Sequence, residues 1–286
     1  MENKEEDGHL LVRGDTVDAM EEFVADESVD LVFADPPYNI GKNFNGRIDR
    51  MAETEYIEWS YSWLSVCVRK LKPTGSMYVM TSTQFMPYFD LFLRDKVQIL
   101  SRIIWSYDSS GVQARKYYGS MYEPILFAVK DPAKYTFNAK DIKVAARTGS
   151  VRKLIDYRKD PPQPYSNDKV PGNVWYIPRV RYRMEEYEEH PSQKPVALLE
   201  RIILASSNEG DTVLDPFAGT FTTSFVSRKL KRHSISVEND EDYFKIGLRR
   251  VLGLTHYNGI ELRPPSKNYG KVTVETPSLF GENGLE

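Results

Sequence analysis

Cysteine and histidine are scarce in this chain, which has one Cys and four His among 286 residues. A single cysteine, Cys67, excludes an internal disulfide and a cysteine-rich zinc site, and the histidines are not spaced like metal ligands, so we expect no bound metal. The chain also lacks an apolar run of about 18 residues, the length of a membrane span. The acidic stretch from Met1 to Asp7 does not resemble a secretory signal. These absences predict a cytoplasmic protein without membrane contact.

The chain has little net charge, because its 38 Lys and Arg residues nearly balance its 41 Asp and Glu residues and leave a net charge of −3. The distribution is uneven, because residues 140–183 hold 11 Lys or Arg against 4 Asp, a local charge of +7 that leaves −10 for the rest. A basic segment on an acidic body is the pattern expected of a protein that binds nucleic-acid phosphates, although a solvated basic surface would look the same.

Short apolar segments alternate with amphipathic ones along most of the chain. This alternation predicts an α/β fold with a mostly parallel sheet that helices cover on both faces, and ligands bind such sheets beyond the carboxyl ends of the strands. Residues 72–75 are expected to form a turn. The expected strands are 9–13, 29–34, 76–81, 98–105, 122–130, 212–214 and 234–237, and the expected helices are 16–25, 54–71, 84–94, 195–206 and 241–252, with a turn and helix over 215–230.

The alternation breaks over residues 131–189, where six prolines lie among basic and aromatic residues. Structureless segments of this length are uncommon in a compact core, so we expect an inserted subdomain or a long functional loop. After residue 254 the chain is polar and is expected to form a loosely held tail.

The first motif with clear chemistry is Asp35-Pro36-Pro37-Tyr38, which directly follows an expected buried strand. An exocyclic amino nitrogen of a base is a poor nucleophile, because its lone pair is delocalised into the ring. The Asp35 carboxylate and the Pro36 carbonyl are suited to accept its two hydrogens, and two prolines stiffen that geometry. Tyr38 offers a face on which an extruded base can stack. The alternative is a purely structural role, in which the two prolines form a turn and the tyrosine packs in the core.

The second motif runs from Val213 to Thr223, where an expected strand enters a turn of small residues that opens a helix. Gly219 lets the backbone approach a ligand, and a helix N-terminus suits a carboxylate such as that of S-adenosylmethionine (SAM). Glu238 ends the next expected strand, where an acid can accept hydrogen bonds from ribose hydroxyls or cap a helix instead.

With both motifs in this order, the chain resembles the β class of DNA amino-methyltransferases, and within it the bacterial enzymes that methylate adenine N6. The resemblance implies a Rossmann-like SAM-dependent methyltransferase fold with SAM as cofactor. It covers about residues 9–253 and depends on matches over 33–42, 105–113, 118–125, 156–165, 171–181 and 194–223. One departure is Phe221, where most of the class has a second glycine, so the residue either narrows the cofactor pocket or packs beneath it.

The resemblance also implies roles for individual residues. The catalytic residues would be Asp35, Pro36 and Tyr38. The SAM-binding residues would be Asp15 at the adenine edge, Lys194 near the methionine end, Asp35, the turn residues Asp215, Phe217, Gly219 and Thr220, and Glu238 at the ribose.

Domain organisation and partners follow from the same resemblance. We expect a catalytic half over 9–130, a target-recognition insertion over 131–189, a SAM-binding half over 190–253 and a tail over 254–286. Arg179, Arg181 and Arg183 alternate as if on one face of a strand and are expected to contact double-stranded DNA. The adenine enzymes that this sequence resembles most act on the palindrome ATGCAT, so the resemblance implies the same target here. The class often forms homodimers, so we expect a homodimer. Many members serve restriction–modification systems, but the sequence does not reveal an accompanying restriction enzyme.

Other acceptors and classes remain as alternatives. Cytosine N4, RNA adenine or a protein glutamine would use the same chemistry, but cytosine enzymes usually carry Ser and glutamine enzymes Asn in place of Asp35. Methylation at cytosine C5 needs a nucleophilic cysteine, and Cys67 lies in an expected helix as a structural residue. A nucleotide-dependent oxidoreductase is disfavoured because Gly-x-Gly-x-x-Gly is absent. An inactive DNA-binding relative would be expected to have lost Asp35 or Tyr38.

Overall fold

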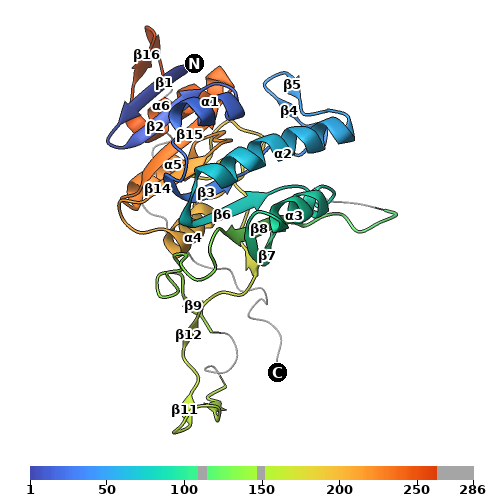
Figure 1. The fold of residues 1–286 in the computed structure, drawn as a ribbon, viewed down its shortest axis with the longest axis vertical. Helices are drawn as coiled ribbons and strands as arrows, with labels where there is room; N and C mark the ends of the chain where they lie inside the picture. Colours follow the sequence, from blue (N-terminus) through green and yellow to red (C-terminus); the bar gives the residue numbers. More distant parts are fainter. Residues whose placement is uncertain (109–114, 147–151, 263–286) are drawn as a thin grey trace.

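A nine-stranded sheet in the order β1-β2-β15-β14-β3-β6-β8-β7-β13 forms the centre of the molecule (Figure 1). The computed structural model describes residues 1–108, 115–146 and 152–262. The strands of the sheet are β1 (Glu2–Glu6), β2 (His9–Arg13), β3 (Val29–Ala34), β6 (Leu71–Met80), β7 (Gln98–Ser106), β8 (Tyr122–Val129), β13 (Val174–Tyr176), β14 (Thr212–Asp215) and β15 (His233–Glu238). The helices are α1 (Thr16–Phe23), α2 (Glu53–Lys70), α3 (Met86–Arg94), α4 (Val196–Ser206), α5 (Thr222–Lys229) and α6 (Glu241–Leu252).

Most neighbouring strands run parallel, as the alternation in the sequence predicts. Among the described residues, five neighbouring pairs of this sheet are parallel and three are antiparallel. The antiparallel pairs are β1 with β2 and β8 with both β6 and β7. The parallel block β2-β15-β14-β3-β6 has all its carboxyl ends at one edge, which is where such sheets bind ligands.

Helices cover both faces of the sheet because the side chains of a strand alternate between its faces. In β3, Val32 and Ala34 pack in a cluster with α2 and α3, whereas Leu31 and Phe33 pack in a second cluster with α4. A third cluster joins α6 to the β2 end of the sheet. Because helices bury both faces of these strands, the residues on both faces are apolar. The strands therefore appear in the sequence as continuous apolar runs.

Several element boundaries differ from expectation. The stretch 72–75, expected as a turn, belongs to β6 as a bulge, since the pairing with β3 shifts register between Val29 and Leu31. Strand β1 was not expected, because its five residues are polar and mostly exposed. Part of the expected tail forms a hairpin of β16 (His256–Tyr257) and β17 (Ile260–Glu261), and Tyr257 and Leu262 pack against α6. Residues 263–286 lie outside the described part of the chain.

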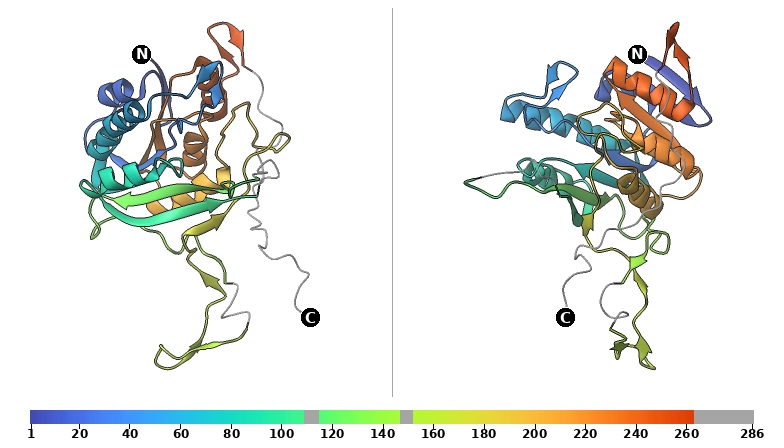
Figure 2. Two further views of the ribbon diagram at one scale, coloured as in Figure 1. Left: turned by 90° about the vertical axis from the view of Figure 1, so that its right-hand side faces the viewer. Right: turned by 180° about the vertical axis from the view of Figure 1, so that it is seen from behind.

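The segment 131–189 forms an arm and one strand of the main sheet. The pairs β9 (Val144–Ala145) with β12 (Asp168–Lys169) and β10 (Ile155–Asp156) with β11 (Gln163–Pro164) build the arm. Figures 1 and 2 show this arm extending away from the sheet, with β11 near its far end. The chain then returns as β13, which pairs in parallel with β7 at the sheet edge.

The remaining strands, β4 (Asn43–Phe44) and β5 (Arg47–Ile48), form a small hairpin in the loop after β3. Across residues 1–108, 115–146 and 152–262 we find no helix with the length and apolar character that crossing a bilayer requires.

Candidate active site

Three acidic side chains lie at the carboxyl ends of neighbouring parallel strands. Asp35 follows β3, Asp215 ends β14 and Glu238 ends β15, and β14 lies between the other two strands. All three line one cavity of about 920 Å³. This volume is near the upper end of the range of about 300–1,000 Å³ that is usual for small-ligand pockets. The fold therefore brings the two sequence motifs together in a single site.

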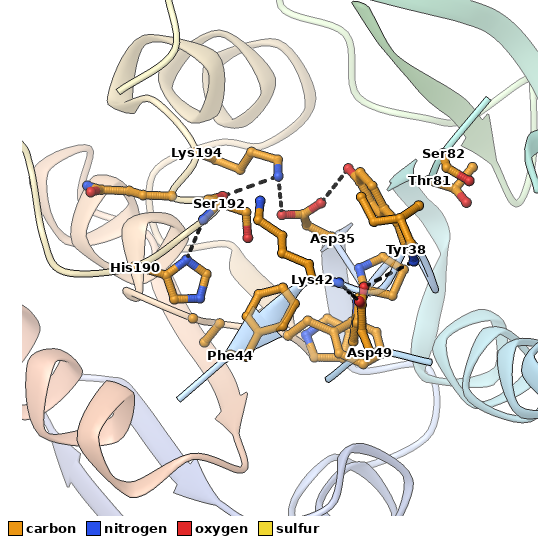
Figure 3. A pocket seen from close by; sticks show the side chains of 18 of the residues that line it. Asp35, Tyr38, Lys42, Phe44, Asp49, Thr81, Ser82, His190, Ser192 and Lys194 are labelled. Atoms are coloured by element: carbon orange, nitrogen blue, oxygen red, sulfur yellow. Dashed lines mark hydrogen bonds and ion pairs between the residues drawn. The ribbon is translucent and has the colours of Figure 1, made fainter. Parts of the chain in front are cut away.

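Two donors engage Asp35, and both also reach a second acid, Glu123. Lys194 Nζ lies 2.6 Å from Asp35 Oδ2, and the Tyr38 hydroxyl donates to Asp35 Oδ1 over 2.7 Å (Figure 3). Glu123 Oε2 lies 3.5 Å from the same ammonium and accepts from the same hydroxyl over 2.9 Å. Two carboxylates thus share one ammonium and one phenol.

Burial and mutual attraction set the charges of this cluster. Burial raises the pKa of Asp35, with Lys194 opposing the shift, and burial raises the pKa of Tyr38 well above its ordinary value. Burial also disfavours the charged forms of Glu123 and Lys194, but attraction between opposite charges prevails. The pKa of Glu123 is therefore lowered and that of Lys194 raised. We expect a charged lysine among carboxylates, with Tyr38 as a neutral donor.

Glu123 is the site residue that the sequence analysis missed. It is the second residue of β8, it is nearly buried, and its other oxygen accepts from the Tyr107 hydroxyl over 3.2 Å. A signal was present, because a carboxylate at the start of an otherwise apolar strand is unusual unless the charge is paired. Its partners became visible only when β8 lay near the end of β3.

The Pro-Pro turn after β3 is held in place from α2. Pro36 is buried and lines the cavity, and the Tyr56 hydroxyl donates to the Pro37 carbonyl over 2.7 Å. Tyr56 itself packs in the core beside Phe85, with ring centroids 4.5 Å apart. A rigid support of this kind fixes the direction of the backbone carbonyls of the turn.

The turn after β14 is organised by its own carboxylates. Asp215 accepts from the Phe217 amide over 3.0 Å and from the Thr223 hydroxyl, and Glu238 accepts from the Gly219 amide over 2.8 Å. Two amides that the sequence seemed to offer to a ligand are therefore taken by side chains. Burial raises the pKa of both Asp215 and Glu238 to about 7.

Phe221 packs beneath the cavity rather than into it. The residue adopts a left-handed conformation, with φ of 57°, directly before α5. Its ring is fully buried in the cluster of α6, and its ring centroid lies 6.2 Å from that of Phe244. Thr220, before it, lines the cavity, and its hydroxyl lies 3.2 Å from Arg250 Nη1.

Asp15 lies at the mouth of the same cavity. Its carboxylate caps α1 by accepting from the Val17 amide over 2.8 Å, and the side chain remains exposed. The next residue, Thr16, donates its hydroxyl to the Pro216 carbonyl over 2.7 Å. The turn after β2 is thereby tied to the turn after β14, so Asp15 and Asp215 border one cavity.

His190 closes the cavity over Gly219. Its Nδ1 accepts from the Ser192 amide over 3.2 Å, which leaves the ring hydrogen on Nε2. A Cβ on Gly219, where φ is +51°, would lie 3.1 Å from that Nε2, so the position favours glycine on two grounds. Burial lowers the pKa of His190 to about 3, and its ring contacts Phe44 and Tyr243.

The three arginines expected on one strand do not lie on a strand. Residues 177–181 have no regular structure, and Arg183 is in a turn with φ of 73°. Arg179 lines the cavity with its guanidinium 4.9 Å from the Tyr107 ring, and Arg181 donates to the Asp108 carbonyl over 2.8 Å. The alternation in the sequence was misleading because Pro178 interrupts the segment after β13.

Cys67 lies in α2 as a buried residue, with Sγ 3.7 Å from Met20 Sδ. Burial raises the pKa of its thiol, so the thiolate is disfavoured. Among the described residues that line the cavity, this cysteine does not appear.

Comparison with protein families gives a match to a model described as DNA methylase over residues 29–249. The DNA adenine methyltransferase YhdJ of Escherichia coli is 58% identical over 257 residues, which cover 90% of this chain and 87% of that protein. The type II methyltransferase M.HpaI of Haemophilus parainfluenzae is 35% identical over 82% of this chain and 71% of that protein.

Two solved structures share this fold. M1.HpyAVI in complex with SAM matches with a TM-score of 0.56 and 25% identity, over 84% of this chain and 98% of that one. The cytosine-N4-specific PvuII DNA methyltransferase matches with a TM-score of 0.63 and 20% identity, over 89% of this chain and 88% of that one. At 20% identity, the second likeness concerns the fold.

Proposed function

The chain belongs to the DNA methylase family, and we infer that it is an adenine-specific, SAM-dependent DNA methyltransferase that acts on the exocyclic N6. The observation that carries this inference is the place of Asp35, in one cavity with Asp215 and Glu238. In this arrangement Asp35 serves the base that receives the methyl group, and Asp215 and Glu238 serve SAM, which donates it.

The base to be methylated would be held between Asp35 and the Pro36 carbonyl, with Tyr38 stacking on it. The adenine must leave the duplex, since its amino edge is paired in the helix. Asp35 and a backbone carbonyl each accept one N6 hydrogen, so the nitrogen lone pair turns towards the methyl donor. A stacked aromatic contributes about 1–3 kcal/mol to binding a base.

SAM supplies an electrophilic methyl group, and the residues of this cavity fit the cofactor. Glu238 is a half-buried carboxylate at the end of β15, suited to ribose hydroxyls, and Asp15 is an exposed acceptor suited to an adenine edge. M1.HpyAVI, with this fold, was solved with SAM. We assign SAM contacts to Asp15, Asp35, Asp215, Phe217, Gly219, Thr220 and Glu238. For Lys194 the expected contact with the methionine end stays a prediction, since its ammonium lies at Asp35.

The segment 131–189 is the proposed target-recognition region, between a catalytic half and a SAM-binding half. Its support is the extended arm together with the local charge of +7 over 140–183. Arg179, Arg181 and Arg183 are proposed to contact DNA, with Arg179 nearest the cavity. By likeness to YhdJ, ATGCAT is the proposed target and a homodimer the proposed assembly, and a cytoplasmic location agrees with a DNA substrate.

The function is tested by incubating the purified protein with tritiated SAM and duplex DNA, followed by sequencing that detects N6-methyladenine. We expect N6-methyladenine at one palindromic site. Modification confined to a motif other than ATGCAT would overturn the target and leave the chemistry intact. N4-methylcytosine alone would overturn both, and no transfer would favour a DNA-binding protein without activity.

A further inference from the structure

Asp35 has no oxygen free of a donor in the structure. Oδ1 accepts from the Tyr38 hydroxyl and Oδ2 is paired with the Lys194 ammonium, at 2.7 and 2.6 Å. The carboxylate is 14% exposed and the lysine side chain 8% exposed, so the pair is largely out of water. Each carboxylate oxygen can accept a second hydrogen bond, but an amino group that approaches Oδ2 meets the Lys194 ammonium there and competes with it for that oxygen.

Displacing a buried ammonium is costly unless a second anion receives it. Glu123 is placed to do so, because its Oε2 lies 3.5 Å from Lys194 Nζ and its side chain is 13% exposed. The Ser192 carbonyl, 3.3 Å from the same nitrogen, offers a further acceptor. The Lys194 ammonium is thus in contact with Asp35, and it would have to move by only about one ångström to be equally close to Glu123.

We propose that Lys194 holds, in the free protein, the position at Asp35 that the target amino group takes in the complex, and that Glu123 receives the ammonium when the base enters. This inference rests on the proposed function. Asp35 and Lys194 both remain paired before and after the exchange, so neither buried charge is left alone. Glu123 is a positioning residue in this exchange, because it acts through the lysine and not on the base.

The exchange makes the site selective for bases that carry an amino group. A base without one offers Asp35 no hydrogen, and the ammonium then stays on Asp35. An adenine replaces that contact with its own, and the cost depends on how well Glu123 holds the lysine. Glu123 therefore strengthens the binding of adenine without strengthening the binding of the same purine ring without its amino group.

The test measures binding of duplexes that carry either adenine or unsubstituted purine at the position the wild-type protein methylates, without SAM. Glu123→Gln should weaken binding of the adenine duplex by about tenfold or more, because the displaced ammonium loses its counterion, and should change binding of the purine duplex by less than about twofold. The matched control is Tyr107→Phe, which removes a hydrogen bond to Glu123 and keeps its charge. It should affect both duplexes alike.

A second series uses Lys194→Met, in which no ammonium needs to move. In that background Glu123→Gln should no longer distinguish the two duplexes, which a merely structural role of Glu123 would not explain. If Glu123→Gln does not fold, Glu123→Asp retains the charge at a shorter reach and should give a smaller selective loss. Equal losses on both duplexes, or selectivity that persists without Lys194, would overturn the exchange. A wild-type protein that forms no N6-methyladenine would overturn the proposed function as well.

Discussion

The ring of Phe221 fills the space into which a side chain on Gly247 would project. A Cβ on Gly247, in α6, would lie 2.5 Å from Phe221 Cδ2. Phe221 directly precedes α5 with a φ of 57°, a conformation that costs a non-glycine residue about 1–2 kcal/mol. Burial of the ring under α6 offsets that strain. This pairing explains how the chain accommodates phenylalanine at the position where the resemblance of the sequence led us to expect a second glycine.

At most positions an alanine variant is more stable than the glycine variant, but at position 221 we expect the glycine variant to be the more stable of the two. Phe221→Ala loses the buried ring at a cost of about 3–5 kcal/mol in the free energy of unfolding. Phe221→Gly should be less destabilising than Phe221→Ala by about 1 kcal/mol, because glycine has no strain at positive φ. Gly247→Ala should destabilise the protein alone but add little cost in the Phe221→Gly background. Urea unfolding measures all four variants, and additive effects would contradict the contact.

Asp35→Ala should abolish methylation and leave SAM binding largely intact. Loss of one group that acts on the reacting centre typically costs about 10²–10³ in rate, and here the variant also loses an ordered base. Single-turnover transfer from tritiated SAM gives the rate, and calorimetry gives the affinity for SAM. An activity within about tenfold of the wild type would refute the assignment of Asp35.

Tyr38 has two separable parts, a ring and a hydroxyl. Tyr38→Phe keeps the stacking face and removes the hydrogen bonds to Asp35 and Glu123, so base binding should change little while transfer slows. Tyr38→Ala should lose a further stacking energy of about 1–3 kcal/mol. Fluorescence of 2-aminopurine at the target position reports extrusion of the base. Equal signals from the two variants would mean that the ring does not stack.

Because the pKa of Glu238 is raised, we expect protein stability and SAM affinity to change in opposite directions with pH. Its pKa of about 7 in the folded protein lies above its ordinary value of 4.5 because burial disfavours the charge. Between pH 4.5 and about 7 the unfolded chain loses this proton while the folded protein keeps it, so the stability of the empty protein falls as the pH rises through that range. SAM affinity should rise instead, by up to about tenfold from pH 6 to pH 8, because the carboxylate accepts ribose hydroxyls best when it is ionised.

Glu238→Gln is the control for that dependence. This variant should bind SAM weakly at every pH and lose most of the variation between pH 6 and pH 8. Asp215, with its pKa also raised to about 7, titrates over the same interval, so Asp215→Asn is measured in parallel. A wild-type affinity that is flat over this interval would contradict the ribose assignment.

The DNA contacts proposed for 131–189 can be tested by measuring how DNA affinity depends on salt concentration. Arg183→Gln should reduce the slope of log affinity against log salt by about 0.9 if the guanidinium neutralises one phosphate. Lys231→Gln is the matched control, since Lys231 is exposed just before β15, at the edge of the sheet opposite the cavity. Equal slopes for Arg183→Gln and wild type would exclude this contact. Exchanging 131–189 between relatives should transfer the target sequence.

The sequence by itself determined the parallel core and its two motifs. β3 and α6 have the bounds that apolar runs and caps predict, because local periodicity and the physics of buried strands coincide there. Asp35 and Asp215 were recognisable because each lies at the carboxyl end of a buried strand, and the carboxyl ends of parallel strands face one edge of the sheet. The same reasoning failed at β1 and around Arg179–Arg183, where no burial pattern constrains the backbone.

Only the tertiary structure decided how the charges of the site are paired. Glu123 reaches Tyr38 and Lys194 because β8 enters the sheet antiparallel beside β6, which places the start of β8 at the carboxyl edge of the parallel strands. The place of Phe221 beneath the cavity likewise depended on Gly247, which lies in α6. Pairing of buried charges and filling of space are interactions between distant segments, and their energies depend on distances that the order of residues along the chain does not specify.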